Sequence, residues 1–288
     1  MSVVIETSSI SKSFGKKQAL NNVSLTVNGG EIFGFLGPNG AGKTTTIRTL
    51  MDFIRPDSGT VRIFGKDVRD NSALRQDIGY LSADNQLLDR WNAEEHIAFY
   101  NSVKGNGANA GELIKRLDLD PKAKAGHMST GNRQKLGFVL ALIGAPKLLI
   151  LDEPTRGLDP LLQNEIYAIL KEFADGGGTV FFSSHNLSEV EHLCTSVAII
   201  RAGQVVADKT MADIRAMKTH IINVSFKQAS IELPQLKDVE VSKTSARAFE
   251  LKAKGDLTPL MKEIAKHELA DLEVSHAPLE DIFLEYYK

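Results

Sequence analysis

A glycine-rich segment near the N-terminus constrains the fold of this chain more than any other feature. It follows the pattern G-x-x-x-x-G-K-[ST], whose fixed positions are Gly37, Gly42, Lys43 and Thr44. The apolar run at residues 31–36 predicts a buried strand before it, and a helical pattern of apolar residues follows it. A glycine-rich turn at a helix N-terminus directs several backbone N–H groups to one point and favours phosphate binding. The segment therefore predicts a phosphate site within an α/β fold.

The chemistry of this loop assigns a role to each part. Its glycines allow N–H groups to turn toward phosphate oxygens, and the helix start adds a dipole that favours anions. Lys43 has the length to reach β- and γ-phosphates, and the Thr44 hydroxyl is a suitable Mg²⁺ ligand. The alternative is a glycine-rich turn without a ligand, and the strand and helix beside the loop argue against it. The predicted phosphate contacts are Gly37, Pro38, Asn39, Gly40, Ala41, Gly42, Lys43, Thr44 and Thr45.

Two consecutive acids follow a second buried strand. Residues 147–151 form a strand-like, largely apolar run, and Asp152 and Glu153 come directly after it. The carboxyl ends of parallel strands are where such sheets bind ligands, so both carboxylates are expected beside the phosphate loop. Asp152 is predicted to hold Mg²⁺, directly or through water, and Glu153 to act as the base for an attacking water. Without the phosphate loop, two solvated acids at a strand end would be the better interpretation.

Alternating strand-like and helix-like segments surround these motifs. Strands separated by helices predict a mostly parallel sheet with helices on both faces. Residues 91–143 contain helical patterns only, which predicts a helical insert between two strands of the sheet. Further strands are expected at residues 3–7, 23–27, 60–64, 78–81, 179–183, 197–200 and 204–207, and helices at 43–53, 93–103, 112–119, 132–143 and 161–173.

The pattern changes after about Met217. Strand-like segments at residues 221–226, 239–242 and 248–253 are followed by helical patterns at residues 257–267 and 279–287. A module of roughly 70 residues is large enough to form a small domain of its own. We therefore expect two domains, residues 1–217 and residues 218–288, of which the second is an accessory α+β module.

The composition of the 288-residue chain excludes several classes of protein. Lys and Arg number 34 and Asp and Glu 36, so the net charge of -2 gives no electrostatic basis for a nucleic-acid partner. The single cysteine, Cys194, cannot form an intramolecular disulfide and is expected to be buried. The N-terminus lacks the regions of a signal peptide. The longest apolar stretch, residues 136–151, contains Gly144, Pro146 and Lys147, so it is not expected to cross a membrane.

Four further segments resemble the motifs of ABC-type ATPases. Residues 129–134, S-T-G-N-R-Q, are similar to the family signature, usually L-S-G-G-Q followed by R-Q, and lie just before the strand that ends in two acids. Residues 157–159, G-L-D, are similar to the D-loop, and residues 183–185, S-S-H, to the switch-histidine segment. Phe14 matches the aromatic residue that stacks on adenine. The resemblance covers about residues 3 to 215.

This resemblance implies the fold, the cofactors and the assembly. The expected fold is a P-loop NTPase core with a mostly parallel sheet, an antiparallel β subdomain and a helical insert, plus the small C-terminal module. The expected cofactors are ATP and Mg²⁺. Two subunits are expected to pair head to tail with two ATP molecules between them, as a homodimer or a pseudo-heterodimer.

The resemblance also implies roles for individual residues. His185 would contact the γ-phosphate in its own subunit, where it and Glu153 are the catalytic residues. Ser129 and Gly131 would contact the γ-phosphate that Lys43 of the opposite subunit holds, and the N-terminal end of the helix that follows them favours an anion. Taken alone, Ser129 is a helix cap and His185 a loop histidine. The nucleotide-binding residues that the resemblance adds are Phe14, Ser129, Gly131 and Asp159.

Three positions depart from the family pattern. Thr130 replaces the first signature glycine and adds a side chain near the phosphate, whereas Asn132 in place of glutamine is a milder change. Ala83 stands where the family has a glutamine that helps to ligate Mg²⁺, and alanine has no ligand atom. A water could fill this place. We expect that Asp84 supplies the oxygen ligand instead, with Gln86 and a purely solvated Asp84 as alternatives.

The remaining expectations concern the partner. In the family, the helical insert forms the groove that receives a helix of a membrane permease. The apolar residues of the insert that could line this groove, or could instead belong to the core, are Trp91, Ile97, Phe99 and Tyr100. The tail at residues 279–287 resembles that of ATPases of drug and antibiotic exporters whose permease is a separate chain. The resemblance thus implies a cytoplasmic subunit held at the inner face of the membrane by its permease. The competing class is a soluble ABC ATPase without a permease.

Overall fold

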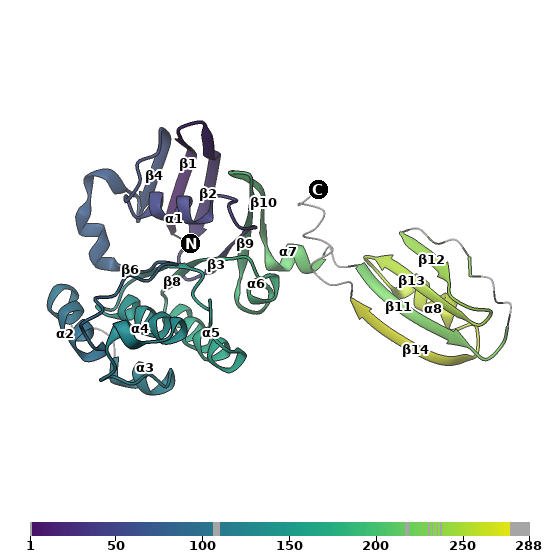
Figure 1. The fold of residues 1–288 in the computed structure, drawn as a ribbon. Coiled ribbons are helices and arrows are strands. Elements are labelled where there is room, and N and C mark those ends of the chain that lie inside the picture. The colour runs from purple at the N-terminus through teal and green to yellow at the C-terminus, as the bar shows by residue number, and fades with distance from the viewer. Residues whose placement is uncertain are drawn as a thin grey trace. The chain divides into compact units, whose positions relative to one another are not determined.

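The chain divides into two compact units, residues 1–209 and residues 210–288 (Figure 1). The computed structural model describes residues 2–105, 110–216, 219–229, 231, 233–234, 236 and 238–276. The first unit contains every motif named above except the tail at residues 279–287, which lies outside the described residues.

A six-stranded sheet forms the centre of the first unit. Its strand order is β10-β9-β3-β8-β7-β6, and β9, β3, β8, β7 and β6 pair in parallel. Because helices cover a parallel sheet, its inner strands are largely apolar. Every residue of β3, β7 and β8 is buried, and the polar residues of β7 and β8 lie at the strand ends. The strands are β3 (Ile32–Leu36), β6 (Ile78–Leu81), β7 (Leu148–Asp152), β8 (Thr179–Ser184), β9 (Ser196–Arg201) and β10 (Gln204–Thr210).

The helices confirm the predicted insert. Between β6 and β7 the chain forms α2 (Ala93–Lys104), α3 (Ala110–Arg116) and α4 (Thr130–Leu142), besides the short 3-10 turn η3 (Ala125–His127). The others are α1 (Lys43–Leu50), α5 (Pro160–Asp175) and α6 (Leu187–Leu193). Helix α1 ends three residues before the predicted end, because the chain turns at Asp52, whose φ is 56°. None of the described helices is both long and apolar enough to span a bilayer.

A second, antiparallel sheet confirms the expected β subdomain. Its order is β2-β1-β4-β5, and its strands are β1 (Val3–Phe14), β2 (Lys17–Asn28), β4 (Ser58–Ile63) and β5 (Lys66–Asp67), followed by the 3-10 turns η1 (Val68–Asp70) and η2 (Ser72–Asp77). Strands β1 and β2 each have 12 residues, far more than predicted. Their polar residues obscured the pattern, because one face of an antiparallel sheet can remain in water.

The second unit has a sheet and core of its own. It contains α7 (Met211–Ala216), β11 (Thr219–Phe226), β12 (Val239–Lys243), β13 (Ala248–Lys254), α8 (Thr258–Ile264) and β14 (Leu269–His276), with strand order β12-β13-β11-β14. Its core includes Ile222, Phe249 and Leu260. The sequence did not predict α7 or β14. Strand β14 is an edge strand whose residues 269–275 are mostly exposed, so burial does not give it a clear apolar pattern.

The direction of the parallel strands positions the predicted site. Strands β3, β6, β7 and β8 run the same way, so their carboxyl ends meet at one edge of the sheet. The phosphate loop follows β3, the loop with Ala83 follows β6, Glu153 follows β7, and His185 follows β8. Four chain segments that are distant in sequence thus converge at one edge.

Strand β6 packs so closely against α4 that adding one methyl group at Gly79 should destabilise the protein. A Cβ atom at Gly79 would lie 2.0 Å from the Ala141 carbonyl oxygen and 2.6 Å from the Leu149 side chain. We expect Gly79→Ala to lower the free energy of unfolding by about 1–3 kcal/mol or more in chemical denaturation, as overpacking does.

Gly176→Ala is the matched control. A Cβ atom there meets its nearest neighbour, the Glu172 carbonyl oxygen, at an ordinary 3.4 Å. Its effect should stay within about 0.5 kcal/mol. Equal stability of the two variants would contradict the described contact between β6 and α4.

Candidate phosphate and metal site

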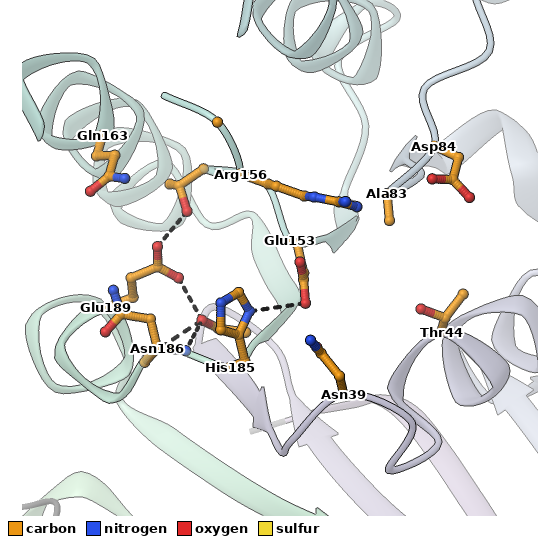
Figure 2. A pocket seen from close by; sticks show the side chains of 13 residues that line it. Asn39, Thr44, Ala83, Asp84, Glu153, Arg156, Gln163, His185, Asn186 and Glu189 are labelled. Carbon is orange, nitrogen blue, oxygen red and sulfur yellow. Dashed lines mark hydrogen bonds and ion pairs between the residues drawn. The ribbon is translucent and has the colours of Figure 1, made fainter. Parts of the chain in front are cut away.

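A cavity of about 680 Å³ opens at the edge where the parallel strands end. Figure 2 shows its side chains pointing inward from the phosphate loop, the loop after β6, the turn after β7 and the start of α6. We call it the carboxylate cavity. Its lining residues are Asn39, Thr44, Ala83, Asp84, Glu153, Thr155, Arg156, Gly157, Gln163, Ser184, His185, Asn186 and Glu189.

The phosphate loop depends on glycine where it enters α1. Gly42 has a φ of 116°, a left-handed conformation that favours glycine, and a Cβ atom there would lie 2.8 Å from the Ala19 carbonyl oxygen. This close turn brings the loop to the N-terminus of α1 with free backbone N–H groups, as a phosphate cradle requires.

Lys43 lies inside the loop, as predicted. Its side chain is 6% exposed, and its ammonium donates hydrogen bonds to the carbonyl oxygens of Gly37, at 2.6 Å, and Pro38, at 3.3 Å. The ammonium is also 3.8 Å from Glu153 Oε1. Burial lowers the pKa of Lys43, and the carboxylates of Glu153 and Asp152 oppose that shift. The loop thus places a buried cation at the point where phosphate oxygens would bind.

A second cavity, of about 250 Å³, extends from the same loop. The Phe14 ring lies at its wall together with the loop, and this ring is half exposed. Lys12 Nζ lies 5.7 Å from the ring centroid, a cation–π contact at the edge of the cavity. The ring is therefore available to stack on a planar group attached to the bound phosphates. The loop residues that line this cavity are Pro38, Asn39, Gly40, Gly42, Lys43, Thr44 and Thr45.

Asp152 and Thr44, two of the residues predicted to hold a cation, are hydrogen-bonded to each other. Thr44 Oγ1 donates a hydrogen bond of 2.8 Å to Asp152 Oδ2, and Ser183 Oγ donates one of 2.5 Å to Oδ1. Asp152 is 1% exposed, so its orientation is fixed by these two hydroxyls. A carboxylate and a hydroxyl oxygen are hard ligands that fit Mg²⁺. The position of Asp152 beside α1 matches its expected place next to the phosphate loop.

Glu153 is held in a strained backbone conformation. Its φ is 51°, and its N–H is directed at Ser183, lying 3.2 Å from the carbonyl oxygen and 3.1 Å from Oγ. Gln134 Nε2 donates a hydrogen bond of 3.0 Å to the Glu153 carbonyl oxygen. These contacts turn the side chain into the cavity, where Oε1 lies 3.1 Å from His185 Nδ1. The two predicted catalytic residues therefore meet.

The other predicted nucleotide contacts lie at helix starts. Ser129 caps α4, where its Oγ accepts a hydrogen bond of 3.2 Å from the Asn132 N–H. Asp159 caps α5 by accepting from the N–H groups of Leu161 and Leu162. Ser129, Gly131 and Asp159 line neither the carboxylate cavity nor the cavity at Phe14. Within the described part of one chain, they are thus not brought to the phosphate loop.

The loop after β6 brings Asp84 to the site. Asn85 Nδ2 donates a hydrogen bond of 2.7 Å to the Arg133 carbonyl oxygen, which fixes the loop to α4. Ala83 and Asp84 then line the carboxylate cavity on the same side as Thr44 (Figure 2). Gln86 is not among the lining residues of this cavity.

Several lining residues were not assigned a role from the sequence, although Ser184 belongs to the predicted switch-histidine segment. Arg156 and Gln163 flank the predicted D-loop segment, and Thr155, Ser184 and Glu189 form a hydrogen-bonded group at the cavity wall. Glu189 lies in the first turn of α6, four residues after His185, and its closeness to His185 in the sequence is the one signal that would have pointed to it. Cys194 is buried, as predicted, and burial raises the pKa of its thiol.

Comparison with known proteins places these features in a family. The ABC transporter family model matches residues 20–156. The linearmycin resistance ATP-binding protein of Bacillus subtilis is 31% identical over 98% of this chain and 97% of that protein. The bacitracin transport ATP-binding protein of Bacillus licheniformis is 36% identical over 72% of this chain and 70% of that protein. A solved dimeric structure of a bacterial ABC transporter cassette aligns with a TM-score of 0.67 at 24% identity, over 72% of this chain and 98% of that one.

The backbone of Glu153 supplies a test of the described site. A left-handed conformation costs a residue with a Cβ atom about 1–2 kcal/mol, and glycine avoids that cost. Glu153→Gly and Glu153→Ala both remove the carboxylate, so their difference isolates the backbone term. We expect the glycine variant to be more stable by about 1 kcal/mol in urea denaturation. Alanine also gains about 0.4–1 kcal/mol over glycine because its unfolded chain is less flexible. An alanine variant that is more stable than the glycine variant by that amount would contradict a left-handed backbone at Glu153.

Proposed function

We propose that this chain, which belongs to the ABC transporter family, binds and hydrolyses ATP to drive export of a substrate through a separate membrane permease. The main support is the convergence of the phosphate loop and Glu153 on one cavity, in which Thr44 is also hydrogen-bonded to the buried Asp152. Export is supported by the names of two relatives, one of which confers linearmycin resistance and one of which serves bacitracin transport.

The loop and the cation site account for binding of Mg-ATP. The backbone N–H groups of the loop and the Lys43 ammonium bind the phosphates, and the Phe14 ring stacks on the adenine. Thr44 and Asp152 would hold Mg²⁺, which would neutralise charge on the phosphates. The 2.8 Å contact between their oxygens indicates that both already face one point.

Hydrolysis requires a base for the attacking water. Among the residues that the structure describes, Glu153 is the only carboxylate that lines both cavities of the loop, and its left-handed backbone directs it there. Its Oε1 accepts the proton of the water, and His185, 3.1 Å away, orients this carboxylate and contacts the γ-phosphate. Lys43, at 3.8 Å from the same oxygen, stabilises negative charge as it develops.

The site is completed by a second copy of the chain or by a similar subunit. Ser129, Gly131 and Asp159 lie at helix starts outside the cavities of their own chain, although such starts favour anions. A head-to-tail dimer would bring these residues to the γ-phosphate of the partner chain. The dimeric cassette with the same fold supports this arrangement.

The permease partner would bind the helical insert. Phe99 is 51% exposed and Leu88 is 55% exposed, and the Trp91 ring packs against Phe99 with centroids 5.7 Å apart. Ile97 instead belongs to the buried core. An exposed apolar group of this kind on a water-facing surface marks a site of protein interaction. The chain would thus lie at the inner face of the membrane, bound to its permease.

The C-terminal module is proposed to be separate from the chemistry. Every residue assigned to phosphate, metal or base lies before residue 190, and the second unit has a core of its own. We place the nucleotide-binding domain in the first unit and the accessory domain in the second, which sets the boundary at residue 209 and not at the predicted residue 217. Nucleotide binding would then be independent of the accessory domain.

Asp84 is proposed to replace the missing glutamine as a Mg²⁺ ligand. Ala83 has no ligand atom, whereas Asp84 lies one residue further on and lines the cavity that contains Thr44. Its carboxylate is a hard oxygen ligand, and Mg²⁺ retains waters at the positions that remain. Gln86 is disfavoured because it does not line the cavity.

Loss of the base gives the first test of this function. Glu153→Gln should retain ATP binding, because the loop is unchanged, but should slow hydrolysis by about 10²-fold or more. Phosphate release and equilibrium binding of a fluorescent ATP analogue measure the two effects. Glu172→Gln, a change at an exposed carboxylate paired with Arg116, is the control and should hydrolyse ATP normally. Wild-type turnover of Glu153→Gln would disprove the assignment of the base.

Mg²⁺ titrations test the role of Asp84. Asp84→Ala should raise the Mg²⁺ concentration needed for half-maximal ATPase activity, and Ala83→Gln in that background should restore part of the loss. Gln86→Ala is the matched control and should leave the titration unchanged. If Asp84→Ala also leaves it unchanged, water rather than Asp84 occupies the ligand position.

A further inference from the structure

A buried carboxylate at the wall of the carboxylate cavity has no role in the chemistry described so far. Glu189, on α6, is only 7% exposed. Its Oε1 accepts a hydrogen bond from Thr155 Oγ1, and its Oε2 accepts one of 2.6 Å from Ser184 Oγ (Figure 2). In the part of the chain that the structure describes, no ion pair involves Glu189. A buried carboxylate without a cation needs such donors, so the two hydroxyls and the carboxylate depend on one another.

The two hydroxyls belong to the two segments that carry the proposed catalytic pair. Thr155 follows Glu153 by two residues, and Ser184 directly precedes His185. Ser184 Oγ also accepts a hydrogen bond of 2.8 Å from the Asn186 N–H, which closes the turn around His185. One carboxylate therefore connects the turn after β7 to the turn after β8.

A second contact joins the same two turns. Glu153 Oε1 and His185 Nδ1 are 3.1 Å apart in the cavity. Tyr167, on α5, lies beside the carboxylate, and burial together with Glu189 raises the pKa of its hydroxyl. Thr155, Ser184, Tyr167 and Glu189 are all buried, so the group is shielded from water that would compete for its hydrogen bonds.

We propose that Glu189 is a positioning residue for Glu153 and His185. By accepting hydrogen bonds from Thr155 and Ser184, it holds the turns after β7 and β8 together and keeps the two side chains within hydrogen-bond distance. This inference rests on the proposed roles of Glu153 and His185. Glu189 does not touch the phosphate loop, Phe14 or the Thr44–Asp152 pair in the described contacts. Its loss therefore affects the reaction step and not the binding of ATP.

Glu189→Gln tests the carboxylate with little change in shape. The two hydroxyls donate to different carboxylate oxygens, and the amide replaces one of these oxygens with an NH2 donor, so it cannot accept from both hydroxyls in their present positions. Small errors in the position of catalytic groups cost up to about 10²-fold in rate, and we expect kcat to fall by about 10-fold or more. The KM and the Kd for ATP should stay within about twofold. Turnover is divided by the measured number of bound ATP molecules per chain, which corrects for unfolded protein.

Thr155 supplies a matched pair of variants that leaves Glu189 in place. Thr155→Ser retains the hydroxyl and should retain most of kcat, whereas Thr155→Val retains the shape but loses the donor and should lower kcat as Glu189→Gln does. In the double variant, Thr155→Val should cause little further loss, because residues that act as one unit are not additive. Glu172→Gln again serves as the control for a lost carboxylate. The Thr155 pair keeps the test decisive if Glu189→Gln does not fold.

Four outcomes would overturn the proposal, the first three of which concern kcat. These three are a wild-type kcat in Glu189→Gln or Thr155→Val, equal effects of Thr155→Ser and Thr155→Val, and additive losses in the double variant. A parallel loss of kcat and ATP affinity would also contradict it, since that result indicates a structural role. Glu153→Gln separates these failures from failure of the proposed function. If that variant is inactive while the Glu189 variants are normal, only the positioning role is wrong.

Discussion

The parallel pairing of β3, β7 and β8 is the constraint on which the rest of this structure depends. It sets the ends of three buried strands side by side, so the phosphate loop, the Asp152–Glu153 pair and the Ser184–His185 turn meet at one edge. The hydroxyl of Ser183, the residue paired with Asp152 in the sheet, then donates to the Asp152 carboxylate. The strand register thus determines the positions of the reacting groups directly.

Charge is distributed around this edge in a way that suits a phosphate ligand. The buried Lys43 ammonium is balanced by Glu153 and Asp152, whereas Asp152 and Glu189 are each held by two hydroxyl donors. Hydroxyl donors fix a carboxylate without neutralising it. The Asp152 carboxylate would therefore keep its charge for the proposed cation.

Short sequence patterns predicted the residues whose roles depend on local structure. The spacing of Gly37, Gly42 and Lys43 identified the loop, and the buried strand before Asp152 and Glu153 placed both acids at a strand end. Long-range contacts were not predictable, since nothing near Glu189 in the sequence indicates that Thr155 and Ser184 donate to it. Strand β14 was missed for a related reason, because an exposed edge strand takes its conformation from pairing with β11 and not from burial.

The central claim is that two chains share each ATP site, and mixing two inactive variants tests it most directly. Lys43→Ala damages the phosphate loop, and Ser129→Arg damages the helix start that would complete the partner's site. A mixed dimer of the two has one site in which both residues are intact. Equal amounts should therefore regain about a quarter of wild-type ATP turnover, because half of the dimers are mixed and each has one complete site. A mixture no more active than either variant alone would contradict the shared site.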